Sequence, residues 1–99
     1  MSRFTLSHLA RTDLAEIVEN AAMDKPLAAR RLLRGFFERF RLLAEFPDLG
    51  EKRDDLRSNL LSFSVGSYVL FYFSDADGVR IVRVVHGARN ITALFDFGQ

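Results

Sequence analysis

Four cationic side chains near the end of the chain have the chemistry to act on a charged partner. They are Arg80, Arg83, His86 and Arg89, and no acidic residue lies between Val79 and Thr92. Arginine presents a planar fork that binds phosphate or carboxylate, and histidine exchanges protons near neutral pH. The run predicts a surface that binds an anionic target. The alternative is that these are strand residues that simply face water.

The other residue types exclude several common chemistries. The chain has no cysteine, so it forms neither disulfides nor thiolate metal sites. Its two histidines, His8 and His86, lie far apart and form no spaced cluster of metal ligands. The glycines are isolated turn residues, apart from Gly35 in a helical segment, and form no phosphate-binding loop. We therefore expect no cofactor and no metal.

Length and composition predict one folded domain over residues 1–99. Hydrophobic residues make up 48% of the 99 residues, which favours a packed core over disorder. No stretch approaches the roughly 18 apolar residues that a membrane-spanning helix needs. The N-terminal residues lack the apolar core of an export signal. We therefore expect a cytoplasmic protein that makes no membrane contact.

A second basic run lies in the middle of the chain, although the net charge is only +1. Residues 25–41 carry six Lys or Arg against the single acid Glu38. Such a run is typical of a solvated helix face, and a surface for acidic partners is the alternative.

Hydrophobic periodicity predicts the elements that position these side chains. A short strand candidate at residues 3–6 is followed by helical spacing over Ser7–Ala22 and again over Pro26–Phe46. Ser7 is a plausible N-cap, and Pro47 ends the second helix. Period-two alternation then marks a strand over Leu61–Val65. Glycine-containing turns bound two further strand candidates, Tyr68–Phe73 and Val79–Val85.

This β-α-α-β-β-β order predicts an α+β fold. An antiparallel sheet of three to four strands, packed on one face by an α-helical hairpin, would bury both apolar stripes. We expect Leu14, Ile17, Phe36 and Phe40 to lie between the helices and the sheet. The opposite face of the sheet should be partly open, without a covering element, and should offer a docking surface.

The two tyrosines are four residues apart on one predicted strand. Tyr68 and Tyr72 should therefore share one face of the sheet. Core packing with a hydroxyl at the rim is the more common role of such residues, ahead of catalysis.

The second half of the chain resembles the C-terminal signature of ParE-type toxins. The likeness runs from Tyr68–Tyr72 through a short acidic turn to Val79–Asn90. Upstream, Ala10 with Asp13-Leu14 and Ile17 resembles the family's first helix, and Phe46–Gly50 followed by Arg53–Leu56 resembles its helix-to-sheet loop. The pieces cover almost the whole chain in the right order, which implies a RelE/ParE-like fold.

The resemblance implies the toxin of a type II toxin–antitoxin system. Such a toxin is neutralised by a ParD-like ribbon-helix-helix antitoxin, with which it forms a hetero-oligomer. The antitoxin binds the operator DNA, so the toxin meets that DNA only indirectly. The implied target is DNA gyrase, trapped with cleaved DNA, which would make the chain an inhibitor and not an enzyme. Arg80, Arg83, His86 and Arg89 are the candidate target-binding residues.

Two alternatives stay open within the same resemblance. RelE-like members of the superfamily cut messenger RNA on the ribosome, and here His86 and Arg89 would be the catalytic candidates. Against this, Phe95 stands where RelE-like toxins carry a catalytic Tyr, and the expected strand lysines fall near Leu60 and Ser62. The third possibility is an inactive antitoxin-binding remnant, because Asn90 stands where ParE-like chains more often carry Asp.

Overall fold

The computed structural model describes residues 3–87 and 91–95, and its elements follow the predicted order closely. The helices are α1 (His8–Asp24), α2 (Pro26–Glu45) and α3 (Ile91–Leu94), with a 3₁₀ turn at Pro47–Leu49. The strands are β1 (Arg3–Leu6), β2 (Glu51–Lys52), β3 (Leu61–Val65), β4 (Tyr68–Asp75) and β5 (Gly78–His86).

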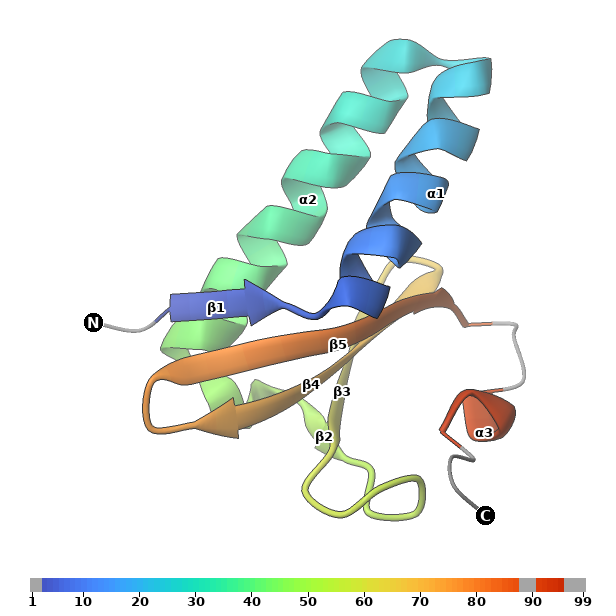
Figure 1. Cartoon of the computed structure of the whole chain (residues 1–99). Helices are drawn as coiled ribbons and strands as arrows, with labels where there is room; N and C mark the ends of the chain where they lie inside the picture. The colour runs from blue at the N-terminus through green and yellow to red at the C-terminus, as the bar shows by residue number, and fades with distance from the viewer. Residues whose placement is uncertain (1–2, 88–90, 96–99) are drawn as a thin grey trace.

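The strands form one sheet in the order β1-β5-β4-β3-β2, with the hairpin of α1 and α2 packed on one face (Figure 1). This confirms the α+β class and the helical hairpin. Two details differ from the prediction of three to four antiparallel strands: the sheet has five strands, and β1 pairs in parallel with β5. Alternation in the sequence does not reveal a strand's partner, and β2 has only two exposed residues, too few for any pattern.

The hairpin between β4 and β5 contains a β-bulge. Phe71 pairs with Arg83 and Tyr72 pairs with Ile81, so Val82 is an extra residue of β5 at this point. A bulge interrupts the alternation of faces along its strand. As a result Ile81 and Val84 face the helices. Strict alternation from Ile81 would have placed Arg83 on that side, and the bulge prevents this.

The main hydrophobic core lies between the helical hairpin and the sheet. Phe36 and Phe40 are fully buried and Leu14 is 5% exposed, while Ile17 is partly buried at the edge of the cluster. All four residues were predicted at this interface, and the structure confirms them.

The opposite face of the sheet is more covered than the sequence predicted. Leu60, Phe71, Val85 and Phe95 form a second buried cluster there, next to α3 (Figure 1). The rings of Phe71 and Phe95 meet edge to face with their centroids 4.8 Å apart. The expectation of a face without a covering element was therefore wrong, because a helix of four residues is too short to leave a periodic signal.

Two local features attach α1 and β1 to β5. The hydroxyl of Ser7 accepts a hydrogen bond from the Ala10 N–H, as an N-cap does, and donates to the Val82 carbonyl at 2.9 Å. Gly78, with φ of 143°, lies so close to the Arg3 backbone that a Cβ atom would overlap it.

No helix among the described residues is long and apolar enough to cross a membrane.

Candidate functional site

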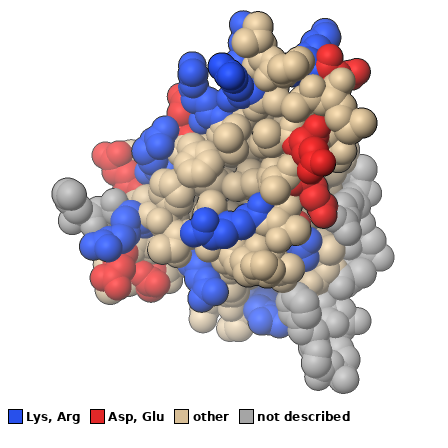
Figure 2. All heavy atoms as spheres, turned by 45° about the horizontal axis from the view of Figure 1, so that its top comes forward, with Lys and Arg blue, Asp and Glu red and all other residues tan. Residues whose placement is uncertain are grey.

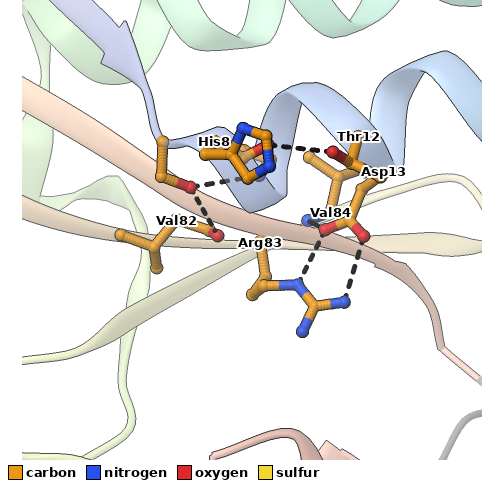
Figure 3. Close-up of polar contacts among 8 residues, drawn as sticks. His8, Thr12, Asp13, Val82, Arg83 and Val84 are labelled. Atoms are coloured by element: carbon orange, nitrogen blue, oxygen red, sulfur yellow. Dashed lines mark hydrogen bonds and ion pairs between the residues drawn. The ribbon is translucent and has the colours of Figure 1, made fainter.

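A buried ion pair links α1 to the bulged part of β5 (Figure 3). The Arg83 guanidinium donates to both carboxylate oxygens of Asp13, from Nε at 2.8 Å and from Nη2 at 3.0 Å. The Val84 N–H donates to the same carboxylate at 2.9 Å. These hydrogen bonds to Asp13 raise the pKa of Arg83, against the opposing effect of partial burial. Arg83 is thus a charged residue whose charge is already paired.

A pocket of about 280 Å³ lies between the first residues of α1, the strands β4 and β5, and Phe95, and we call it the Arg80 pocket. Its rim carries four groups that are cationic or can become so: His8, Arg57, Arg80 and Arg83. Its apolar wall consists of Leu9, Phe73, Val82 and Phe95, and Ser7 completes it. An anionic group on an apolar stem fits such a lining.

Arg80 is an exposed cation of this pocket. Its side chain is exposed and forms no ion pair with any residue in 3–87 or 91–95. Arg83, three positions on, reaches the same pocket because of the bulge at Val82. The structure therefore brings together two of the four residues that the sequence singled out.

His86 lies in a different place. At the end of β5 it packs edge to face against Tyr68, with ring centroids 5.6 Å apart. Both residues line a second pocket of about 400 Å³ between α1 and the ends of β4 and β5, which we call the Tyr68 pocket. Arg89, the fourth predicted site residue, and Asn90 lie outside the described residues.

The two tyrosines share the helix-facing side of the sheet, as predicted. Tyr72 is fully buried, and its hydroxyl donates to the Pro47 carbonyl at 2.7 Å and accepts from the Gly50 N–H at 2.9 Å. Burial raises the pKa of this hydroxyl. The Tyr72 hydroxyl therefore fastens the turn after α2 to the sheet.

The positions that matter for RNA cleavage are buried. Leu60 is fully buried, Ser62 is 6% exposed and Phe95 is 7% exposed. These are the places where RelE-like toxins are expected to carry cations and a proton-transferring Tyr. Here they contribute to packing, and the Phe95 ring has no proton to exchange.

The basic run of residues 25–41 lies on the solvent side of the helical hairpin. All six Lys and Arg residues of the run are exposed. In Figure 2 basic side chains gather over α2, whereas acidic ones gather over α1. The two helices thus present opposite charges.

Residues 3–87 and 91–95 hold no group of three or more His, Cys, Asp or Glu that could bind a metal ion.

The sequence did not predict the roles of Asp13, His8 and Arg57 around the Arg80 pocket. Asp13 was recognised only as part of the family-like first helix, although an acid beside Leu14 in an apolar stripe is a signal for a buried partner. His8 and Arg57 line the Arg80 pocket but lie far from β5 in the sequence, and no local pattern connects them with it.

The fold, a helical hairpin packed on one face of a sheet, also occurs in a solved structure. A solved structure described as the chromosomal ParDE TA system from P. aeruginosa matches with a TM-score of 0.73 and 15% identity, over 87% of this chain and 96% of that chain. That match shows the fold.

Sequence comparisons identify the family. The model of the ParE toxin of type II toxin–antitoxin systems, parDE, matches residues 4–91. Toxin ParE3 of Caulobacter vibrioides is 32% identical over 78 residues, which are 79% of this chain and 75% of that protein. The chain belongs to the ParE toxin family of type II toxin–antitoxin systems.

Proposed function

We propose that this chain is the toxin of a ParDE-type pair and that it inhibits DNA gyrase by holding the enzyme on cleaved DNA. The family match over residues 4–91 is the observation that carries the proposal. It acts in the cytoplasm, as an inhibitor and without a catalytic step of its own.

The Arg80 pocket is the proposed contact surface for the target. Arg80 supplies an exposed positive charge, whereas the charge of Arg83 is largely compensated by Asp13. Arg83 therefore contributes to the wall of the pocket and little to the electrostatic attraction of an anionic target. Arg89 is proposed to bind the target from its sequence alone, and His86 joins the contact if the target also reaches the end of β5.

The ribonuclease alternative requires proton-transferring groups and cations at three positions where the described residues are Leu60, Ser62 and Phe95. Cleavage of RNA needs one group to take the 2′-hydroxyl proton and another to protonate the leaving oxygen. Phe95 offers neither, and Leu60 and Ser62 are buried in place of the expected cations. His86, the notable proton-exchanging candidate, packs against Tyr68 in the other pocket.

The proposed antitoxin is a ParD-like ribbon-helix-helix protein that forms a hetero-oligomer with this chain. Large apolar side chains exposed on the surface support a partner that covers them: Leu9, Met23, Leu27, Leu42, Phe46 and Leu49. We propose that a C-terminal segment of the antitoxin covers part of this surface, chiefly as a helix in a groove. Operator DNA would then be bound by the antitoxin alone.

Expression in cells tests the proposal. Induction of the chain without its antitoxin should cause filamentous growth and DNA-damage signalling, and co-expression of the antitoxin should prevent both. Immediate loss of translation would favour the ribonuclease. Normal growth, together with co-purification of the antitoxin, would indicate the inactive remnant.

A further inference from the structure

The Tyr68 pocket differs in chemistry from the Arg80 pocket, although the two lie on either side of the Asp13–Arg83 pair. Its polar lining consists of Asp13, Glu16, Asn20, Tyr68 and His86, and its apolar lining of Ile17, Ala21, Val84 and Val85. No Lys or Arg among residues 3–87 and 91–95 lines it. A pocket lined by two carboxylates and by no described Lys or Arg favours a positively charged occupant.

Of the two carboxylates, Glu16 is the one available to a ligand. The Asp13 carboxylate already accepts hydrogen bonds from Nε and Nη2 of Arg83 and from the Val84 N–H. Glu16 is exposed and forms no ion pair with any described residue, although it lies near enough to contribute to the raised pKa of Arg83. With Arg83 balancing Asp13, the pocket keeps about one negative charge, on Glu16.

The aromatic wall of the pocket is held in place by its neighbours. The Tyr68 ring packs edge to face against Phe36, with centroids 5.4 Å apart, and against His86, with centroids 5.6 Å apart. A fixed aromatic ring beside a carboxylate binds a cation through its π face and through the charge pair. Ile17 and Ala21 offer an apolar surface for a methylene stem.

We propose that the Tyr68 pocket binds one arginine side chain of a protein partner. The guanidinium would pair with the Glu16 carboxylate and pack on Tyr68, while its stem lies on Ile17. Arginine fits better than lysine because its planar guanidinium can stack on a ring and form two hydrogen bonds with a carboxylate at the same time. The acidic side chains that gather over α1 in Figure 2 favour the approach of such a basic partner. This inference does not depend on gyrase being the target.

The test uses the full chain labelled with ¹⁵N and a probe that isolates the side chain. N-acetyl-arginine amide is titrated to about 50 mM, since a single side chain binds weakly. The uncharged analogue N-acetyl-citrulline amide is the matched control for the probe. Glu16→Gln is the test variant, and Glu19→Gln is its control, because Glu19 is exposed on the same helix and does not line the pocket.

The arginine probe should shift the backbone amide signals of Glu16, Asn20, Tyr68 and His86 in a saturable manner. Citrulline should not shift them, Glu16→Gln should weaken the affinity about threefold or more, and Glu19→Gln should leave it unchanged. All variants should keep the wild-type spectrum elsewhere, which confirms folding. Equal shifts with citrulline, no shifts at these residues, or an affinity unchanged by Glu16→Gln would overturn the proposal.

Discussion

The carboxylate of Asp13 holds the guanidinium of Arg83 through two hydrogen bonds across 70 positions of sequence. Asp13 lines the Tyr68 pocket and Arg83 lines the Arg80 pocket, so this pair forms part of the wall between them. It also fixes the start of α1 against the bulge of β5. Both pockets therefore depend on one ion pair for their shape.

Asp13→Asn should strongly destabilise the protein. The two side chains are only 10% and 13% exposed, so the substitution leaves the Arg83 guanidinium buried without a countercharge. Loss of one partner of a buried pair costs about 3–5 kcal/mol of unfolding free energy. Urea denaturation measures the effect.

Asp55→Asn is the control for that experiment. It breaks the exposed pair between Arg53 and Asp55, whose carboxylate is well solvated, and should change the urea midpoint little. Equal midpoints for Asp13→Asn and Asp55→Asn would show that the buried pair is not important for stability.

Tyr72→Phe should cost about 1–3 kcal/mol of unfolding free energy. The change removes a hydroxyl that bonds the Pro47 carbonyl and the Gly50 N–H, and leaves both backbone groups without that partner. Thermal and urea unfolding of the two proteins measure the difference. A variant as stable as wild type would show that water replaces both bonds at no cost.

Tyr72 should also make the protein less stable at alkaline pH. Burial raises the pKa of its hydroxyl in the folded state, so the unfolded chain loses this proton first as the pH rises. The stabilisation is fully present below the unfolded pKa of about 10 and is lost as the pH rises through the higher folded pKa. Urea midpoints from pH 8 to 11 should therefore fall less steeply in Tyr72→Phe than in wild type. Tyr68→Phe changes the other tyrosine and is the control: its urea midpoint should fall with pH as steeply as that of wild type.

Phe36→Ala should cost about 3–5 kcal/mol, because it opens a cavity at the centre of the main core. Phe36 is fully buried and packs against both Phe40 and Tyr68. Phe37→Ala, one position along the same helix at a half-buried site, should cost clearly less. Equal losses in unfolding free energy would contradict the assigned face of α2.

The sequence was sufficient to predict the helices and the central strands. Pro26 and Pro47 mark the ends of α2, alternation marks β3, and glycine-containing turns bound β4 and β5, because these signals are local. The direction of β1 and the two-residue β2 were not predicted, since both depend on pairing with distant segments.

The candidate site was predicted less well, for a definite physical reason. The sequence predicted one basic surface at the end of a strand, formed by Arg80, Arg83, His86 and Arg89. The bulge at Val82 turns Arg83 toward Arg80, and His86 turns toward Tyr68 on the helix side. The bulge depends on the register of two strands, and the ion-pair partner of Arg83 lies in α1. No local sequence pattern therefore predicts the bulge or the ion pair.

Inhibition of gyrase by the purified chain is the most direct test of the central claim. In a supercoiling assay the wild-type chain should block gyrase and accumulate cleaved DNA. Arg80→Ala should weaken the inhibition roughly threefold or more, because it removes the exposed charge of the Arg80 pocket. Arg39→Ala removes an equally exposed arginine of α2 and should leave inhibition unchanged. Unimpaired supercoiling, with codon-positioned cuts in ribosome-bound messenger RNA that vanish in His86→Ala, would contradict the account.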